Sequence, residues 1–434
     1  MQTNRRKFLK KVGAATVGTA VFPTFIKASV LGREGHVPPS DKITMIGIGC
    51  GSMGQGNLGG LQRNPGVVVI AACDVDDNHL AQTKKRVDEH NGNNDCRIYK
   101  DYREILEKEK ADTAMLALPD HWHALIACAV VEKKMDVYGE KPLARSIVES
   151  RTIVNAAKKN NVIWQMGSWQ RSQPNFLHAA ELVINGRIGD VKYVEVGLPN
   201  GGQYIGNPSA KTIPEGLDWE MWLGPAPEVP YRGVSHWDWR WINDYSGGQL
   251  TDWAGHHIDI AHWGLGLDRT GPVTIEGAGR RHPDGLYDVY NEYDFMCEYA
   301  SGVKIRVANN QKLRYGGGVH WVGSDGWIHV DRGRLEASDE KILEEVIGDE
   351  EIRLYKSRNH TGNFVECVKS RKETITPCDI GHRSISVGLL GEIAMITGDK
   401  LHWDPETEKF TDNNPTASRL LERPYRAPWK LPEY

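Results

Sequence analysis

Lys141 is the residue of this sequence whose position most favours chemistry. It lies in the run Tyr138-Gly139-Glu140-Lys141-Pro142, which follows a short apolar strand candidate and precedes a helix-like run from Ser146 to Lys159. A lysine at this junction can reach ligands bound by the chain on either side of it, where its amine can hold and polarise a substrate oxygen. The competing interpretation is a structural ion pair with Glu140 or another acid.

Asp252 and His256 form a second pair with suitable residue types. In a helix, residues four apart share one face. A carboxylate beside an imidazole fixes the tautomer of the ring and raises its basicity, which prepares it to act as a general base. Two other interpretations remain open. His256, Asp259 and His262 are possible metal ligands, although no second ligand set is evident and we predict no metal. Hydrogen-bonded helix residues are the simplest interpretation, and it fits His257 and His262.

A glycine-rich turn follows the first apolar strand candidate, residues 42–48. It reads Gly49-Cys50-Gly51-Ser52-Met53-Gly54, which is the Gly-x-Gly-x-x-Gly pattern, and it opens a helix candidate. In such turns the first glycine permits the sharp bend and the second lets the backbone approach a pyrophosphate. The third permits close packing of the helix, whose N-terminus faces the anion.

A second apolar run, residues 67–73, ends at Asp74, 20 residues after Gly54. A carboxylate at this spacing can accept hydrogen bonds from both ribose hydroxyls of adenosine. It would repel a 2'-phosphate, and no arginine follows it to receive one. The pattern therefore favours NAD over NADP.

Strand and helix candidates alternate over residues 42–166, which predicts βαβ units and a parallel sheet. In such sheets ligands bind beyond the carboxyl ends of the strands. The glycine turn, Asp74, the stretch from Pro119 to His123, and Glu140 with Lys141 all fall at such ends. Beyond the first two strands, the predicted strands cover residues 97–99, 113–118, 136–138 and 162–166, and the predicted helices cover 76–90, 102–108, 123–133 and 146–160.

In this order the motifs resemble the Gfo/Idh/MocA family, named after glucose–fructose oxidoreductase and inositol dehydrogenase. The resemblance covers about residues 42–400 and rests on the glycine turn, Asp74, Pro119-x-x-x-His123 and Glu140-Lys141-Pro142. It implies an α/β fold: an N-terminal Rossmann dinucleotide-binding domain and a C-terminal α/β domain with a large open, mostly antiparallel sheet. The family also carries a Gly-Gly…Asp-x-x-x-His-x-x-Asp pattern whose histidine assists proton transfer.

Aligning that pattern gives the catalytic position to His256 rather than His257. Ala254 stands where many members have glycine, and Gly255 comes one place later. With the strand-end positions, the resemblance gives three sets of candidate residues. The catalytic candidates are Lys141, Asp252 and His256. The cofactor-binding candidates are Gly49, Gly51, Ser52, Met53, Gly54, Asp74, Leu118, Pro119, His123, Glu140, Lys141 and Gln170. The substrate-binding candidates are Lys141, Arg171, Trp241, Asp252 and His256.

The chain beyond residue 166 predicts a second kind of domain. Most of its strand candidates lie between residues 272 and 330, and helix candidates cover 175–185, 363–370 and 383–396. The stretch 199–244 is loop-rich and dense in tryptophan. Flat indole rings stack well on sugar rings, but most tryptophans are core residues, so we expect only one or two to contact a ligand. Half of the fourteen tryptophans are Trp219, Trp222, Trp237, Trp239, Trp241, Trp253 and Trp263.

Composition excludes several classes. The 434 residues are 40% hydrophobic and 25% charged, with a formal net charge of −4, which gives no support for nucleic-acid binding. No apolar run reaches the roughly 18 residues that a bilayer span requires. The seven cysteines are scattered, which argues against a zinc ribbon or a disulfide framework.

The N-terminus predicts export. Arg5-Arg6-Lys7-Phe8-Leu9 precedes a short apolar stretch, an arrangement that resembles a twin-arginine signal. We expect a signal at 1–30, a linker at 31–41, a Rossmann domain at 42–166, a substrate and oligomerisation domain at 167–403, and an arm at 404–434 of the kind that covers a neighbouring subunit. A homo-oligomer, dimer or tetramer, is therefore expected. The alternative is a cytoplasmic protein whose N-terminal residues are not an export signal.

These features predict NAD-dependent oxidoreduction of a secondary hydroxyl of a sugar, glycoside or polyol. Because the periplasm maintains no NAD pool, we expect NAD to be carried out tightly bound. Tight binding also suits a redox-neutral glycosidase or epimerase that works through a 3-keto sugar, which is the first alternative. A catalytically inactive sugar-binding relative is the second.

Overall fold

The computed structural model describes residues 41–434, so the predicted signal and the linker as far as residue 40 lie outside the described residues. Within this part of the chain, no helix combines the length and apolar character needed to cross a bilayer. The residues from Ile43 to Tyr434 form one unit.

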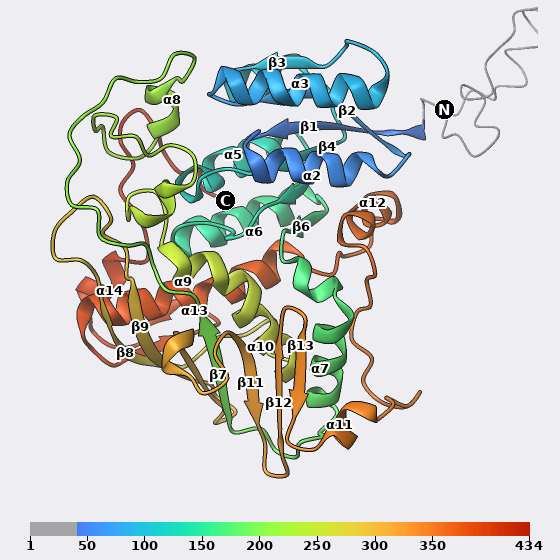
Figure 1. Cartoon of the computed structure of the whole chain (residues 1–434), viewed down its shortest axis with the longest axis vertical. Helices are drawn as coiled ribbons and strands as arrows, with labels where there is room; N and C mark the ends of the chain where they lie inside the picture. Colours follow the sequence, from blue (N-terminus) through green and yellow to red (C-terminus); the bar gives the residue numbers. More distant parts are fainter. Residues whose placement is uncertain (1–40) are drawn as a thin grey trace, which may run out of the picture. The chain divides into compact units, whose positions relative to one another are not determined.

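A six-stranded sheet forms the N-terminal domain, and all of its strand pairs are parallel. The strand order β3-β2-β1-β4-β5-β6 puts the switch point between β1 and β4, where ligands bind in open sheets of this kind (Figure 1). The central strands are short apolar runs because helices cover both faces. The strands are β1 Ile43–Ile48, β2 Val67–Cys73, β3 Arg97–Tyr99, β4 Thr113–Leu116, β5 Asp136–Gly139 and β6 Trp164–Met166.

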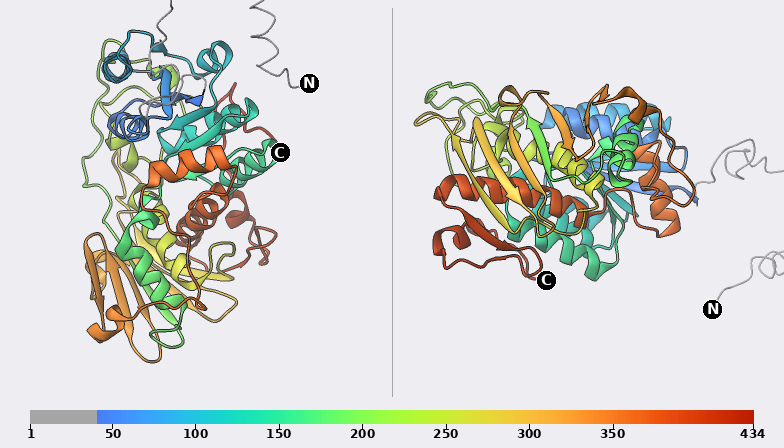
Figure 2. Two further views of the ribbon diagram at one scale, coloured as in Figure 1. Left: turned by 90° about the vertical axis from the view of Figure 1, so that its right-hand side faces the viewer. Right: turned by 90° about the horizontal axis from the view of Figure 1, so that it is seen from below.

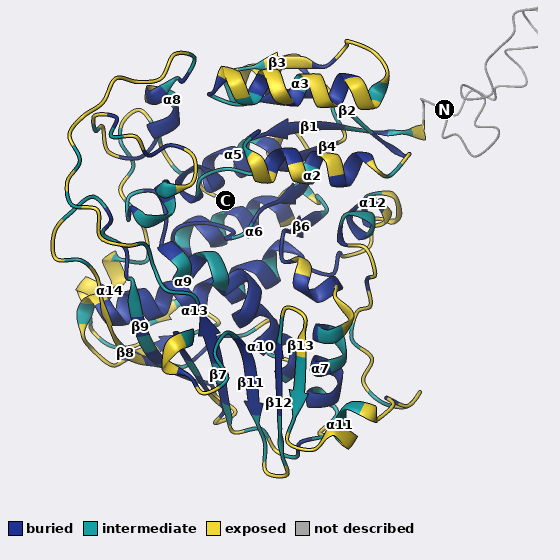
Figure 3. Cartoon of the chain, in the orientation of Figure 1, coloured by how far each residue is buried: buried dark blue, intermediate teal, exposed yellow. Residues whose placement is uncertain are grey.

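The helices of this domain begin at residues suited to cap them. Asp76 caps α3 by accepting from the Asn78 N–H, and Ser146 caps α6 by accepting from the Glu149 N–H. Their apolar faces are buried against the sheet, and the outer face of α3 is exposed (Figure 3). The helices are α2 Ser52–Gln62, α3 Asp77–Asn91, α4 Tyr102–Lys108, α5 His123–Glu132 and α6 Ile147–Asn160.

The second sheet has nine strands in the order β13-β12-β11-β7-β10-β9-β8-β14-β15. Only β7 and β10 pair in parallel; the other described pairs are antiparallel. The predicted fold class, a Rossmann domain followed by a domain with a large, mostly antiparallel sheet, is therefore confirmed. The strands are β7 Tyr193–Leu198, β8 Thr274–Arg280, β9 Glu292–Glu298, β10 Lys304–Asn309, β11 Gly318–Val322, β12 Trp327–Asp331, β13 Arg334–Ala337, β14 Leu401–Asp404 and β15 Lys409–Phe410.

Helices pack along this sheet and join it to the first domain. The long α13 lies against β8 and β9 and also contacts α6, and α12 packs on α2 (Figure 2). Glycines permit the close fit, since a Cβ at Gly391 would meet the Phe295 ring at 2.5 Å. The remaining helices are α7 Pro174–Ile184, α8 Trp219–Leu223, α9 Gly248–Trp253, α10 Asp259–Leu265, α11 Glu340–Glu344, α12 His360–Ser370, α13 Cys378–Thr397 and α14 Pro415–Arg419.

The tryptophan-rich stretch has its own small core beside the Rossmann domain. Trp219 and Trp222 stack with their rings 4.7 Å apart, and the Trp222 indole donates to the Ser235 carbonyl at 2.9 Å. This cluster includes Trp239, so several of these tryptophans are core, as expected. Trp237 is the exception at 57% exposure.

The C-terminal tail packs on its own chain. The Trp429 ring meets the Trp122 ring edge-on at 4.9 Å, and the Tyr434 hydroxyl donates to Glu132 at 2.6 Å. Arg426 donates to the Gly224 carbonyl. The predicted arm therefore packs on the Rossmann domain and on the tryptophan-rich stretch of its own chain, and that it also covers a neighbouring subunit stays a prediction.

Candidate active site

A cavity of about 330 Å³ lies at the carboxyl edge of the Rossmann sheet and is closed by residues 217–240 of the second domain. Ten of the twelve cofactor-binding candidates line it, all except His123 and Gln170. The ten are Gly49, Gly51, Ser52, Met53, Gly54, Asp74, Leu118, Pro119, Glu140 and Lys141. Most of the residues predicted to bind the cofactor at the strand ends therefore line one cavity.

The three glycines of the turn differ in what surrounds them. Gly49 has φ +87°, and a Cβ there would lie 2.1 Å from the Ala117 carbonyl oxygen on the neighbouring strand connection. A Cβ at Gly54 would lie 2.0 Å from the Gly49 oxygen. At Gly51 the nearest atom is a His79 carbon 3.8 Å away, so this backbone faces open space. This is the arrangement that a pyrophosphate requires, and the residues present fit NAD.

Asp74 is held in place at the end of β2. Its carboxylate accepts from the Cys50 N–H at 2.6 Å and from the Asp76 N–H at 2.9 Å. His79 Nδ1 lies 3.4 Å from it, and this hydrogen bond raises the pKa of His79. The carboxylate is thus fixed where the ribose hydroxyls of adenosine would meet it.

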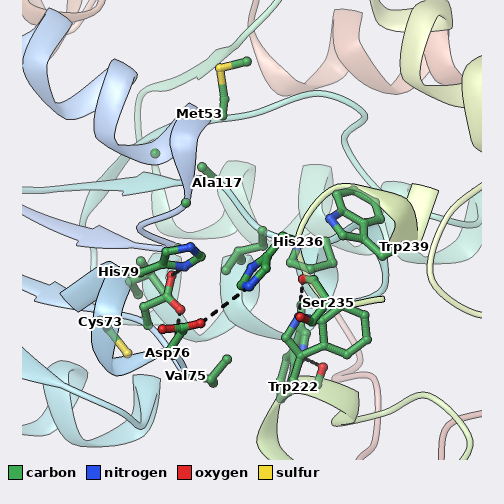
Figure 4. Close-up of a pocket in the computed structure, with 18 of the residues that line it drawn as sticks. Met53, Cys73, Val75, Asp76, His79, Ala117, Trp222, Ser235, His236 and Trp239 are labelled. Atoms are coloured by element: carbon green, nitrogen blue, oxygen red, sulfur yellow. Dashed lines mark hydrogen bonds and ion pairs between the residues drawn. The ribbon is translucent and has the colours of Figure 1, made fainter. Parts of the chain in front are cut away.

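Two histidines that sequence reasoning missed face this end of the cavity. His79 comes from α3 and His236 from the tryptophan-rich stretch, and both approach Asp76 (Figure 4). Their ligand atoms and that of Asp76 lie within 4.8 Å of one another, the one such group of three in residues 41–434. Lys100 also lines the cavity, but it is paired with Asp77 and donates to the Gly216 carbonyl.

At the other end of the cavity Lys141 meets Asp252. The Nζ and Oδ1 atoms are 2.8 Å apart, and the two side chains are 9% and 14% exposed. Arg240 Nε lies 3.6 Å from the same oxygen. Burial alone would raise the pKa of the Asp252 carboxyl, but the charges of Lys141 and Arg240 lower it below its usual value. Glu140 instead accepts from Asn57, so Lys141 finds its partner 111 residues away.

The predicted pairing of Asp252 with His256 is corrected. The chain changes from α9 to a π-helical turn, Ala254–Ile258, whose hydrogen bonds run from i to i+5 and so alter the face that each residue occupies. Asp252 turns to Lys141, and His256 Nδ1 is buried without a hydrogen-bond partner. Gly255 lies in this turn, where a Cβ would come 3.1 Å from Lys141 Cβ. A small residue at 255 therefore lets the turn pack against Lys141.

His256 is neutral near pH 7. Burial lowers the pKa of its imidazole well below the usual value, and the positive charges of Lys141 and Arg332 lower it further. Trp169 and Trp253 flank the ring edge-on, with centroids 6.3 and 5.5 Å from it. The neutral ring leaves Nδ1 able to accept a proton, but in this environment the imidazole is a weak base.

Six predicted residues do not line the cavity: Asp252 and His256, which neighbour Lys141, and four others. Arg171 is buried between Asp259 and Asp268, which satisfy its guanidinium, so the structure does not bring it to the site. His123 Nε2 meets the Leu118 carbonyl, Gln170 meets His257 and Arg332, and Trp241 packs against Gly202. The alternative metal set is not gathered either, because Asp259 binds Arg171 and His262 binds the Tyr299 hydroxyl.

Comparison with known proteins agrees with this geometry. Residues 42–168 match the GFO/IDH/MocA model described as "Oxidoreductase family, NAD-binding Rossmann fold", and residues 200–431 match the same family's "C-terminal alpha/beta domain". The chain is 24% identical to the scyllo-inositol 2-dehydrogenase (NAD(+)) of Bacillus subtilis over 63% of this chain and 72% of that protein.

It is 29% identical to the levoglucosan dehydrogenase of Pseudarthrobacter phenanthrenivorans over 46% of this chain and 50% of that one. The WlbA dehydrogenase of Bordetella pertussis, solved with NADH and UDP-GlcNAcA, has the same fold. Its TM-score is 0.62 at 16% identity, over 84% of this chain and 99% of that chain.

Proposed function

Because the chain belongs to the GFO/IDH/MocA family of oxidoreductases, with an NAD-binding Rossmann domain, we propose that it oxidises a secondary hydroxyl of a sugar, glycoside or polyol. NAD, when bound, supplies the hydride acceptor. The observation that carries the proposal is the contact between Lys141 and Asp252 at the end of the cavity opposite Asp74.

Lys141 and His256 have different roles at the substrate hydroxyl. Lys141, held by Asp252, binds and polarises the substrate oxygen as its proton leaves. His256 receives that proton, because its Nδ1 has no hydrogen-bond partner among the described residues; a bound substrate must first raise the pKa of the imidazole, which burial and the nearby cations lower. Asp252 thus acts through Lys141 and not through His256.

We propose that NAD is held tightly. Support comes from backbone contacts that the second domain makes with the Rossmann domain at the adenosine end of the cavity. Leu217 pairs with Asp76 as an isolated antiparallel bridge, the Asp77 N–H donates to the Gly216 carbonyl, and the Asp218 N–H donates to the Val75 carbonyl. A bound dinucleotide would have to break these contacts to leave.

Tight binding also accords with the export that the N-terminal sequence predicts, and we propose the periplasm as the location. Removing residues 1–30 from a tagged protein and fractionating cells tests this. A full-length protein that stays in the cytoplasm contradicts it. Light scattering of the purified protein tests the proposed homo-oligomer, and a monomer at micromolar concentration contradicts it.

The test of the function is to denature the purified protein, assay the released NAD(H), and then mix native protein with sugars, glycosides and polyols. We expect close to one NAD per chain and NADH absorbance on mixing with a substrate. Release of an aglycone or epimerisation without net NADH favours the redox-neutral alternative. The absence of both bound NAD and any reduction contradicts the proposal.

A further inference from the structure

Two arginines flank the proposed reacting end, and each is held against tryptophan faces. Arg240 lies with Cζ 4.0 Å from the Trp237 ring centre and 4.3 Å from that of Trp239. Arg332 lies 4.7 Å from the ring centre of Trp169 and 4.4 Å from that of Trp253. Such contacts order a guanidinium without neutralising it.

Arg332 stands beside the proposed proton acceptor. It lies in the turn between β12 and β13, and both of its tryptophans also flank His256. Its Nε and Nη2 donate to the Gln170 amide oxygen at 3.2 Å. Among the described residues, no carboxylate oxygen lies within 4 Å of its guanidinium nitrogens. The neighbouring Asp331 lies 3.5 Å from His257 Nε2 and accepts from the backbone N–H of Arg332.

Other arginines show what a purely structural guanidinium does in this chain. Arg171 is 1% exposed and meets Asp259 and Asp268, and Arg145 meets Glu392 through two nitrogens. Arg332 is ordered by aromatic rings and remains open to solvent, with Trp169 beside it at 36% exposure. Its charge is thus available to a ligand.

Three positive charges, those of Lys141, Arg240 and Arg332, lie at this end, and the carboxylates of Asp252, Asp120 and Asp331 act on them. Lys141 and Arg240 share the single carboxylate of Asp252, and the Nε of Arg240 is buried without a hydrogen-bond partner. Arg332 adds a third cation whose charge acts on both His256 and Asp252. An oxyanion would give the exposed guanidinium of Arg332 a charged acceptor, which a neutral sugar does not provide.

We propose that the substrate is a sugar that carries an oxyanion (a carboxylate, sulfate or phosphate group) and that Arg332 binds this group. Guanidinium donors form a fixed fork that can bind two oxygens of a carboxylate, sulfate or phosphate group with paired hydrogen bonds. The two tryptophans hold the fork before the substrate arrives, so little side-chain entropy is lost on binding. The inference rests on the proposed function, since it names the substrate class of the same site.

The test uses matched ligands that differ in the anionic group alone: glucose, glucuronate, glucose 6-sulfate and glucose 6-phosphate, and the corresponding galactose set. Binding to the NAD-containing protein is measured by calorimetry, and NADH formation is measured separately. We expect at least one anionic member to bind about ten- to hundredfold more tightly than its neutral partner, as hydrogen bonds to charged groups suggest. The member that binds identifies the oxyanion.

Arg332→Gln should bring the ratio of anionic to neutral affinity close to one. Arg334→Gln is the matched control: it removes the same charge two residues away, where Arg334 pairs with the exposed Glu336. The control should keep the wild-type ratio. Thermal melting verifies that both variants fold.

Equal affinity for neutral and anionic members, an unchanged ratio in Arg332→Gln, or no binding by any member overturns the oxyanion proposal. Failure of the proposed function is distinguishable from these outcomes. In that case an anionic sugar binds and depends on Arg332, but no sugar reduces NAD.

Discussion

The two ends of the cavity are built in different ways. The adenosine end comes from short contiguous segments: the turn from Gly49 to Gly54 and the aspartate that ends the next strand. The reacting end gathers Lys141 from the end of β5 and Asp252 and Arg240 from the second domain. A local motif therefore specifies the first end, whereas tertiary packing specifies the second.

The two ends also differ in the protonation state that their histidines favour. At the adenosine end, the hydrogen bond to Asp74 raises the pKa of His79. At the reacting end, burial lowers the pKa of His256. The first end is half-open and favours a protonated imidazole; the second is enclosed and favours a neutral one. Substitutions at the two ends should therefore affect different measured quantities.

Asp252→Ala should give the largest combined effect on turnover and stability. It removes the one carboxylate shared by Lys141 and Arg240 and leaves two largely buried cations together. We expect turnover to fall by about a thousandfold and the free energy of unfolding to fall by about 3–5 kcal/mol, measured by steady-state kinetics and urea denaturation. The bound NAD content should change far less. A variant with near wild-type turnover would show that the pair does not organise the reacting end.

Gly49→Ala and Gly51→Ala test the glycine turn as a pair. At Gly49 an added Cβ meets backbone at 2.1 Å in a positive-φ conformation, so we expect a loss of stability of more than about 2 kcal/mol. At Gly51 the space is open, so the fold should survive while NAD retention falls. Melting temperature and released NAD report the two effects. Equal melting temperatures for the two variants would refute this assignment.

Asp74→Ala should weaken NAD binding by about ten- to hundredfold, because hydrogen bonds from both ribose hydroxyls to a charged acceptor are lost. Turnover at saturating NAD should change little, which contrasts with Asp252→Ala. Asp77→Ala, on the same surface and paired only with Lys100, is the control. Calorimetric titration of NAD into protein stripped of cofactor measures both.

Acid should destabilise the protein through its buried histidines. Burial lowers the pKa of His262, His329 and His360 to about 4, whereas in the unfolded chain it is about 6.5. Below pH 6.5 the unfolded state therefore binds more protons than the folded state, so stability is greatest above pH 6.5 and falls as pH decreases towards 4. Each residue should contribute about 1.4 kcal/mol per pH unit. A urea midpoint that is constant from pH 7.5 to 5 would be inconsistent with neutral buried imidazoles.

Sequence reasoning succeeds where neighbours in the chain are neighbours in space. The alternation of apolar runs with capped helices predicts the Rossmann sheet, and the residues that end its strands line the cavity. The spacing of Asp252 and His256 misleads because a π-helical turn between them changes the register, and nothing in four-residue spacing reveals it.

Arg171 and Arg332 show the same limit. The sequence predicts Arg171 for the site and not Arg332, and only their long-range partners show that the Arg171 guanidinium is paired with carboxylates whereas that of Arg332 donates to an amide. Arg240 lies in the run Trp237-Asp238-Trp239-Arg240-Trp241, where a cation among aromatic residues was a usable signal. His79 and His236, which face Asp76, have no such signal in the sequence, because α3 and the tryptophan-rich stretch come together only in the folded chain.

The most direct measurement is a single-turnover experiment on Lys141→Met, which removes the amine but leaves Asp252 its contact with Arg240. Purified wild type and variant, each with its bound NAD quantified, are mixed with the best substrate found, and NADH absorbance is followed. We predict rapid NADH formation in the wild type and a rate at least about a thousandfold lower in the variant, with equal NAD content. Thermal melting verifies that the variant is folded. A variant that forms NADH at the wild-type rate would contradict the assignment of Lys141 and the account of the reacting end.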